Sequence, residues 1–418
     1  MTAESHSAPT TAFRSAGDDI RKVDVAVIGA GVMGATTALY LARGGLDTAL
    51  IDRGGICREA SGVNAGTLTM HMTRAALIPY AIKGWEMWRS TPDWLGAPVP
   101  VRATDGLCLA FTDAEADLLR ERSRVRSQAG APIRIIDPEE ARRIEPGLSD
   151  RAVLAAYCPI DGFASAYLTG RAYRAALTRA GVTMMEYAPV HGIEPEDQTG
   201  YLIRLDGRHV RARRLVLASG VWLGEMLGWL GLDVRVRCLV NQLVVTERLP
   251  MALRSVITVA SGLLSLKQFD NGTALIGGGW QGAGGPDRDS MQLIPENLVG
   301  NVRLAAYAVS ALRRTRILRT WFGPEAETDD AMPMIGPIPE HPNAYIIGSV
   351  HSGYTSGPYM GWLLARRILG DEPEMPLFEI DRLLAASAGE QDGPSSATAP
   401  QSSADAGPAP THPVQEGV

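Results

Sequence analysis

Apolar runs that end in glycine-rich turns occur at three distant places along the chain. The first, VDVAVIG at 23–29, is followed by a helical pattern over 33–45 and by a second apolar run at 48–53. Residues 214–230 and 344–369 repeat this order of strand, turn and helix. Because short apolar runs that alternate with helices are typical of parallel sheets covered by helices, the pattern predicts an α/β fold. We expect the three units to form one Rossmann-like domain assembled from distant segments.

Alternating apolar and polar residues between these units indicate a second domain. The segments LCLAF, NQLVVTE and TALIGGG alternate as half-buried antiparallel strands do, and DAEADLLRERSRVRSQ is typical of a polar helix. We expect residues 99–150 and 236–318 to form an inserted antiparallel-sheet α+β domain that holds the substrate. The Rossmann-like domain then comprises residues 22–98, 151–235 and 319–385.

Both ends of the chain are predicted to be disordered. Residues 1–21 are small and polar, and they lack the apolar stretch of a signal peptide. Residues 386–418 are rich in Ala, Ser, Gly, Pro and Gln, with almost no large apolar side chains to offset the entropy of ordering. The longest apolar run, 215–232, is interrupted by Glu225 and by glycines. It is therefore interpreted as a buried strand, turn and helix rather than a membrane span.

Composition and charge narrow the class of protein. The 418 residues include 40 Lys and Arg against 46 Asp and Glu, a formal net charge of −6, which argues against a nucleic-acid partner. The four cysteines have neither metal-ligand nor disulfide spacing, so no metal site is predicted and a reduced, cytoplasmic location is expected. The 45 glycines gather in clusters, which indicates loops where the backbone approaches a ligand.

The strongest chemical signal is a glycine turn between the first strand and the first helix. Gly29, Gly31 and Gly34 form a G-x-G-x-x-G pattern, and Asp52 ends the next strand. The first glycine permits a tight turn, the second lets the backbone approach a pyrophosphate, and the third lets the helix pack on the strand. Asp52 is expected to accept hydrogen bonds from an adenosine ribose. It argues against a ribose 2′-phosphate, which the neighbouring Arg53 would otherwise favour.

Two further loops point to a flavin rather than a nicotinamide dinucleotide. The small-residue loop ASGVNAGT at 60–67 carries hydroxyl and amide groups soon after the second strand. Such a loop can wrap a pyrophosphate and reach a flavin ring. The late loop GSVHSGY at 348–354 supplies contacts from the other end of the chain.

The order and spacing of several blocks resemble the FAD-dependent oxidoreductases of the D-amino-acid oxidase, glycine oxidase and sarcosine oxidase group. Besides the glycine turn, the blocks are EASGVNAG, PEEARRIEPGL before PIDG, LVLASGVWLGEMLGWLG, VNQLVVTE, GTALIGG, WFGPEAETDDAMPMIG and NAYIIGSVHSGYTSGPYMG. The resemblance extends from Val23 to about Leu369. Within the group, the chain is most similar to glycine oxidase and to the β-type subunits of bacterial sarcosine and opine oxidases.

The resemblance implies a two-domain fold with FAD in an extended pose and its flavin ring at the domain junction. It implies oxidation of a C–N bond α to a carboxylate by hydride transfer to the flavin, followed by hydrolysis of the imine. The residues that it places against FAD are Gly29, Gly31, Val32, Met33, Gly34, Asp52, Arg53, Ser61, Asn64, Ala65, Gly66, Val190, Gly220, Trp222, Gly323, Gly348, His351, Gly353, Tyr354 and Thr355.

Several positions depart from the pattern of the group. An Arg and a Pro commonly follow the tryptophan–glycine pair, whereas this chain has Glu325 and Ala326 there. No cysteine lies near Trp321 or His351, so FAD is expected to be noncovalent. The basic residues that bind a substrate carboxylate or promote the oxygen reaction in some members are not evident, and Thr355 is found at one of their places. Either oxygen or a redox partner is therefore expected as the electron acceptor.

Three side chains are candidates for catalysis. His351 lies in a glycine-rich turn, where it can face flavin and substrate or bond only to the backbone. Tyr354 can stack on the ring or hold a carboxylate through its hydroxyl. Lys267, in LLSLKQFDNG, is the best candidate cation for a substrate carboxylate or for an oxygen-side role, and the alternative is a solvated strand lysine.

The sequence therefore predicts an FAD-dependent oxidoreductase that oxidises the C–N bond of a small amino acid or secondary amine resembling glycine, sarcosine or a D-amino acid. The alternative is a β-type catalytic subunit of a multi-subunit amine or opine dehydrogenase. Such a subunit passes electrons to electron-transfer subunits rather than to oxygen. Two further alternatives are a tailoring enzyme that acts on a larger amine and a flavin-binding protein without turnover.

Overall fold

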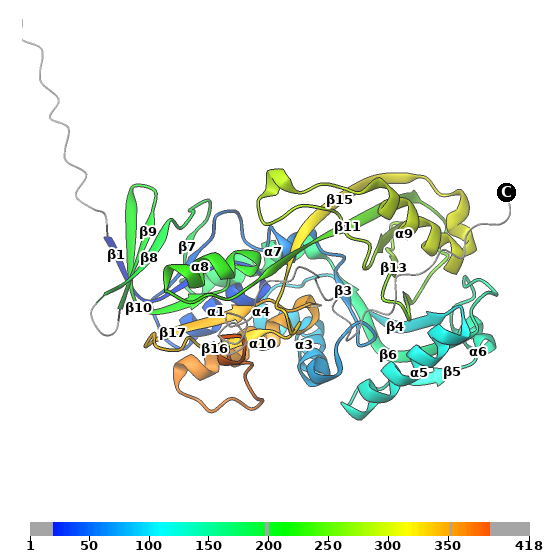
Figure 1. Ribbon diagram of the computed structural model, residues 1–418, viewed down its shortest axis with the longest axis horizontal. Helices are drawn as coiled ribbons and strands as arrows, with labels where there is room; N and C mark the ends of the chain where they lie inside the picture. Colours follow the sequence, from blue (N-terminus) through cyan, green and yellow to red (C-terminus); the bar gives the residue numbers. More distant parts are fainter. Residues whose placement is uncertain (1–19, 197–199, 352, 385–418) are drawn as a thin grey trace, which may run out of the picture.

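The computed structural model describes residues 20–196, 200–351 and 353–384. Figure 1 shows an elongated molecule with one β-sheet toward each end of its long axis, and with β11 and β15 crossing from one end toward the other. The predicted disorder of residues 386–418 lies outside the described residues. At the other end, the prediction of disorder up to residue 21 is wrong for its last two residues, because β1 begins at Ile20 and pairs from there with β10.

The first sheet has eight strands among the described residues, in the order β16-β17-β10-β1-β2-β7, with β9 paired to β10 and β8 paired to β9. Five neighbouring strands, from β17 to β7, are parallel. Residues 25–28 of β1 are buried, as expected for a strand covered on both faces. The strands are β1 (Ile20–Ile28), β2 (Thr48–Ile51), β7 (Thr183–Met185), β8 (Gly192–Glu196), β9 (Gly200–Leu205), β10 (Arg208–Leu217), β16 (Met334–Pro337) and β17 (Ala344–Gly348). The parallel sheet confirms the prediction of an α/β fold assembled from distant segments.

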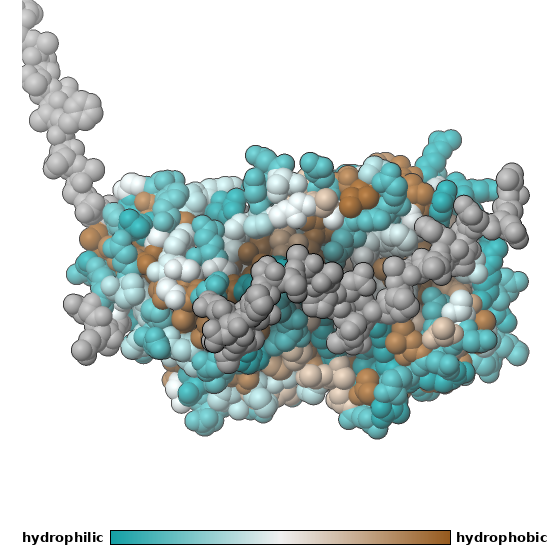
Figure 2. Space-filling view, viewed as in Figure 1, coloured by the Kyte–Doolittle hydropathy of each residue, from teal (hydrophilic) through white to brown (hydrophobic). Residues whose placement is uncertain are grey.

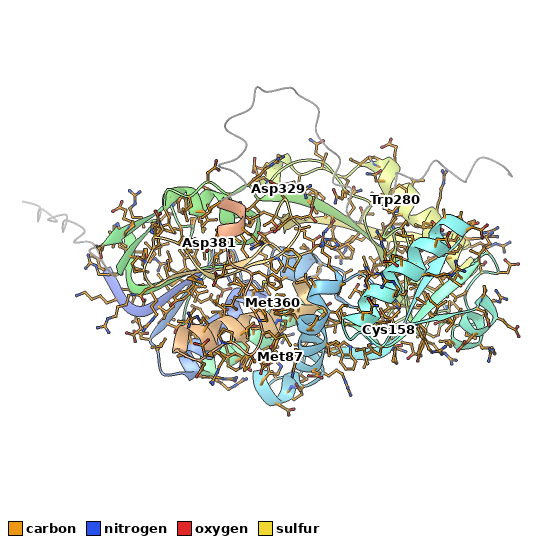
Figure 3. All side chains as sticks on the ribbon, turned by 60° about the horizontal axis from the view of Figure 1, so that its bottom comes forward. Met87, Cys158, Trp280, Asp329, Met360 and Asp381 are labelled. Atoms are coloured by element: carbon orange, nitrogen blue, oxygen red, sulfur yellow. The ribbon has the colours of Figure 1, made fainter. Side chains whose placement is uncertain are left out.

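Helices pack on this sheet and on one another. The helices are α1 (Val32–Arg43), α2 (Ala60–Val63), α3 (Ile78–Arg89), α4 (Thr91–Leu95), α7 (Ala166–Arg179), α8 (Leu223–Trp229) and α10 (Gly353–Leu369). α10 packs on both α1 and α3, and a Cβ added at Gly361 would lie 2.6 Å from the Met33 carbonyl oxygen. Figure 3 shows Met360 on α10 and Met87 on α3 in this half of the molecule, while Cys158 and Trp280 lie in the other half. Helix contact this close requires a glycine.

The second sheet has nine strands in the described part of the chain, in the order β15-β11-β14-β13-β12-β4-β6-β3, with β5 attached to β6. Its pairs are antiparallel except for β12 with β4. The strands are β3 (Thr67–Leu68), β4 (Val101–Ala110), β5 (Arg134–Ile136), β6 (Leu154–Ala164), β11 (Arg237–Arg248), β12 (Val256–Val259), β13 (Ser265–Gln268), β14 (Thr273–Gly277) and β15 (Ile317–Glu327). The helices of this half are α5 (Asp113–Gln128), α6 (Pro138–Ile144) and α9 (Pro295–Ala308).

Two long strands of the second sheet fall outside the segments from which we predicted it. β6 starts after residue 150 and pairs with β4 from Val101↔Ala164 to Ala110↔Leu154. β15 continues past residue 318 and pairs with β11 as far as Glu327. The boundaries were taken from alternating segments between the strand–turn–helix units, and such local patterns do not show how far a long strand pairs with a neighbour of the other sheet. The domain division itself stays a prediction.

The apolar run 215–232 forms the end of β10, a short turn and α8, as predicted. Within the described ranges, no helix combines the length and the hydropathy needed to cross a membrane. Figure 2 shows that the face it presents is mostly hydrophilic, with apolar side chains in separate patches.

Candidate cofactor and substrate site

A cavity of about 660 Å³ extends from the turn after β1 to strands of the second sheet. Its wall includes nearly all the residues predicted to contact cofactor: Gly29, Gly31, Val32, Met33, Gly34, Asp52, Arg53, Ser61, Asn64, Ala65, Val190, Gly220, Trp222, Gly323, Gly348, His351, Gly353, Tyr354 and Thr355. Gly66 is the exception. Its φ is +67°, and a Cβ there would lie 2.1 Å from the Ala164 carbonyl oxygen, so this glycine shapes the loop behind the wall.

Two glycines of the turn are required by close backbone packing, whereas the third faces open space. A Cβ at Gly29 would lie 2.3 Å from the Ala218 carbonyl oxygen, and one at Gly34 would lie 2.0 Å from the Gly29 carbonyl oxygen. A Cβ at Gly31 meets only the Ser61 hydroxyl, at 3.2 Å. Ser61 also accepts a hydrogen bond of 3.0 Å from the Val32 amide in the first turn of α1. The backbone at Gly31 is therefore the part of the turn that a ligand can approach.

Asp52 stiffens the turn from the end of β2. Its two carboxylate oxygens accept hydrogen bonds from the amides of Ala30, at 2.6 Å, and Gly54, at 2.7 Å. Burial raises the pKa of the Asp52 carboxyl, and these two amide bonds oppose the rise. Each carboxylate oxygen has a second lone pair, which leaves it able to accept a ribose hydroxyl as well.

The loop after β2 is built by its own polar side chains. The Asn64 amide nitrogen donates to the carbonyl oxygens of Ala60 and Ser61, at 2.9 and 2.8 Å, and its amide oxygen accepts from the Gly66 amide at 2.6 Å. Trp321 on β15 donates from Nε1 to the Val63 carbonyl oxygen at 2.8 Å. Asn64 therefore shapes the loop around a ligand, and β15 supports the loop from the second sheet.

The end of the cavity beside β2 and α8 is apolar and aromatic. Val190, Trp222 and Trp229 line it, and the Arg53 guanidinium lies 4.5 Å from the centre of the Trp222 ring. A flat, apolar slot beside an arginine–tryptophan pair fits a purine base. This end lies next to Asp52, on the side where an adenosine would extend from the glycine turn.

Two buried serine hydroxyls in the wall lack partners among the described residues. The Oγ atoms of Ser219 and Ser349 make no hydrogen bond, and both side chains line the cavity just beyond the carboxyl ends of β10 and β17. A buried hydroxyl without a partner is costly. Together with the open backbone at Gly31 and the helix N-terminus, the two hydroxyls show that the wall fits a polar dinucleotide.

The opposite end of the cavity carries a histidine–carboxylate pair. His351, between β17 and α10, lies with its Nδ1 3.1 Å from Glu325 Oε2 on β15. The same carboxylate oxygen accepts a hydrogen bond of 2.5 Å from the Asn241 side-chain amide on β11. All three residues line the cavity. In the described part of the wall the only arginines are Arg53 and Arg58, and both belong to the glycine-turn end.

Comparison with known proteins agrees with this geometry. The family model of FAD-dependent oxidoreductases (DAO) matches residues 24–367. The chain belongs to this family. An opine oxidase subunit from Rhizobium meliloti is 26% identical over 88% of this chain and 99% of the relative, and glycine oxidase of Geobacillus kaustophilus is 26% identical over 82% and 92%. The crystal structure of that glycine oxidase has a TM-score of 0.79 at 23% identity, covering 87% of this chain and 98% of the neighbour, and it shows a shared fold.

Family membership makes FAD the cofactor and the protein an oxidoreductase. The residues that would hold FAD are those of the glycine turn, Ser61, the loop at 60–66 and the aromatic slot. Among the described residues, no group of three His, Cys, Asp or Glu is placed to bind a metal ion.

Tyr354 lines the cavity of this flavoenzyme, but its hydroxyl is already engaged. Its Oη lies 2.7 Å from Thr169 Oγ1, and its ring stacks on Trp88 with 4.6 Å between ring centres. Trp88 Nε1 also donates to the Tyr354 carbonyl oxygen at 2.8 Å. Burial strongly raises the pKa of the Tyr354 hydroxyl. These contacts suit a wall residue that fixes the start of α10, and they orient the hydroxyl toward Thr169.

The structure does not bring Lys267 to the cavity. The side chain on β13 is fully buried, and it is not solvated, in contrast to the alternative interpretation of the sequence. Its Nζ donates to the Ala65 carbonyl oxygen at 2.9 Å and to Thr67 Oγ1, and lies 3.4 Å from Ser265 Oγ. Ala65, Thr67 and Ser265 do line the cavity. Lys267 therefore supports the wall from behind, and its role as a cation for substrate or oxygen stays a prediction.

Sequence reasoning missed several residues of the wall. Ser219 and Ser349 are the last residues of the strands predicted at 214–219 and 344–349, and the rule that ligands bind at the carboxyl ends of parallel strands would have found them. Glu325 was noted only as a departure from the family pattern. Its partnership with Asn241 needs the pairing of β11 with β15, which no local signal reveals.

Proposed function

We propose that this flavoenzyme oxidises the C–N bond of a small amino acid or secondary amine. The observation that carries the proposal is the cavity itself. It joins a dinucleotide-binding turn at one end to a polar end formed by His351, Glu325 and Asn241. The names of the relatives, an opine oxidase and a glycine oxidase, support an amine or amino-acid substrate.

The chemistry that FAD supplies when bound is acceptance of a hydride from the substrate carbon next to nitrogen. The protein has three tasks beside it. The glycine turn and Ser61 hold the phosphates, so that the cofactor lies in one orientation. Tyr354, stacked on the buried Trp88, forms part of the wall at the start of α10. The polar end orients the amine, because its hydrogen-bonding groups are fixed before the substrate arrives.

The test is anaerobic reduction of the purified holoprotein by a panel of glycine, sarcosine, D-amino acids, L-proline and simple secondary amines. We expect at least one of them to bleach the flavin absorption in the visible range. A holoprotein whose flavin is bleached by dithionite but by no amine would contradict the proposal.

FAD is expected to be bound without a covalent link. The four cysteines are free thiols, and none of them lines the cavity. Precipitation of the holoprotein with acid should therefore leave all of the flavin absorption in the supernatant, with the mass of the protein unchanged. Flavin that stays with the pellet would contradict this expectation.

The free cysteines also support our proposal of a cytoplasmic location.

The second candidate is the catalytic subunit of a multi-subunit dehydrogenase. It is favoured by the name of the relative that covers 88% of this chain, which is one component of an opine oxidase. The two candidates differ in the step after substrate oxidation. A flavin that is bleached by an amine and recovers within seconds in air indicates an oxidase, whereas one that recovers only with an artificial electron acceptor indicates a dehydrogenase with a redox partner.

A further inference from the structure

The histidine–carboxylate pair at the polar end has the geometry of a proton acceptor. Glu325 fixes His351 through Nδ1, and Asn241 fixes Glu325 through the same carboxylate oxygen. The His351 side chain is 34% exposed, and within the described residues its Nε2 has no hydrogen-bond partner. Because Nδ1 is held by the carboxylate, Nε2 is the nitrogen that can exchange a proton with a molecule in the cavity.

The charges around His351 favour a strong base. Glu325 acts most strongly and raises the pKa of the imidazole, and Glu327 adds to the rise, while burial and the Arg74 guanidinium oppose it. The influence of Glu327 is weak because this carboxylate is paired with Arg74, at 3.3 Å, and with Arg237, at 2.7 Å. These are the titratable groups that act on His351 in the part of the chain described.

Three other candidate bases in the described part of the chain are unsuited to this task. The Tyr354 hydroxyl is bonded to Thr169, and Lys267 lies behind the wall. Asp52 is bonded to two backbone amides at the far end of the cavity. His351 is therefore the base that the geometry offers at the polar end.

The proposed reaction needs such a base. An aliphatic amine is mostly an ammonium ion at neutral pH, and an ammonium nitrogen has no lone pair to support departure of hydride from the neighbouring carbon. We propose that His351, held by Glu325, accepts a proton from the ammonium group of the bound substrate. This inference rests on the proposed amine oxidation, and it assigns the residue that makes the substrate reactive.

The N–H bond of the ammonium breaks, its electron pair stays on nitrogen, and the proton forms a bond to Nε2 of the neutral imidazole. With FAD bound as the two-electron oxidant of this family, the free amine would then be able to give up a hydride from its α-carbon, and water would hydrolyse the resulting iminium. The proton on His351 is later released to solvent.

The test follows the limiting rate of flavin reduction at saturating amine, by anaerobic stopped flow between pH 5.5 and 10. In the wild type we expect the rate to rise with pH through the pKa of His351, because only the neutral imidazole accepts a proton. In Glu325→Gln the rise should move to lower pH, since the amide cannot stabilise imidazolium. His351→Gln should lose the rise and lower the plateau rate about a hundredfold or more.

A matched control is Glu327→Gln, two residues along β15. It removes a carboxylate of the same type that is paired with arginines and does not line the cavity. Its pH profile should move much less than that of Glu325→Gln. FAD content and visible spectra of all variants show whether each is folded, and Glu325→Gln still tests the proposal if His351→Gln does not fold.

Three results would overturn the assignment. One is a pH profile that is unchanged in Glu325→Gln. The rise of the rate would then be caused by ionisation of the substrate itself, which does not depend on this residue. Another is a rate that falls as pH rises, which indicates that imidazolium binds a substrate carboxylate. The third is wild-type activity in His351→Gln. If no amine reduces the wild-type flavin, the proposed function fails instead, and the two failures are thus distinguishable.

Discussion

Gly31→Val is expected to yield folded protein that does not retain FAD. Gly31 has φ −65° and ψ 173°, extended backbone that valine adopts readily. A Cβ at this position meets only the Ser61 hydroxyl, at 3.2 Å, so a small shift of that hydroxyl makes room for the first carbon of the side chain. The same side chain projects into the space where the backbone approaches the pyrophosphate. We expect FAD affinity to fall at least about a hundredfold, equivalent to about 3 kcal/mol.

The measurement is the ratio of flavin to protein absorbance after purification and again after incubation with excess FAD. Gly228→Val is a suitable control, because Gly228 lies in α8, has open space around its Cβ position and does not line the cavity. It should keep a full complement of FAD. A Gly31→Val protein that also keeps the full complement would show that the pyrophosphate does not lie at this turn.

Lys267→Met is expected to stabilise the protein at neutral pH. Burial lowers the pKa of Lys267 to about 7, against an ordinary value near 10.5, because the charged form loses its hydration. Below pH 7 the lysine is charged in both folded and unfolded states, and the folded state bears the full cost of the buried charge. Methionine of similar length removes that cost, and we expect a gain of about 2–4 kcal/mol in the free energy of unfolding.

The stability difference between Lys267→Met and the wild type should depend on pH. Between pH 7 and 10.5 the unfolded state binds the proton and the folded state does not, so the wild type gains about 1.4 kcal/mol per pH unit. The advantage of Lys267→Met should therefore be constant below pH 7 and shrink above it. Denaturant unfolding from pH 6 to 10 measures the difference. Lys83→Met, at an exposed position of α3, should show no such trend. A constant difference in stability across this range would show that burial does not lower the pKa of Lys267.

The sequence was informative wherever a signal is local. The strand, turn and helix around Gly31 were predicted from adjacent residues, and the strands at 214–217 and 344–348 were found in the same way. Parallel strands place their carboxyl ends at one edge of a sheet, so these three turns could be brought to one site without knowledge of the contacts between them. The cavity connects all three.

Contacts set by the register of long strands could not be predicted. Asn241 meets Glu325 because β11 and β15 pair along their length, and a shift of one residue would turn the carboxylate to the other face. Lys267 is an example of the same limit, because the alternation of β13 does not tell whether the buried face looks into the cavity or away from it. For the same reason, we did not predict that β6 and the end of β15 belong to the second sheet.

The C-terminal segment returns to the first sheet, and this has a consequence for when the cofactor pocket can form during synthesis. β17 and α10, which close the sheet against β10 and α1, are the last large elements of the described chain. A ribosome-bound chain that ends before residue 344 lacks Ser349, His351 and the cover over α1, so it cannot complete the pocket. A complete pocket for FAD therefore requires the C-terminal segment, and we expect capture of the cofactor to be a late event in biogenesis.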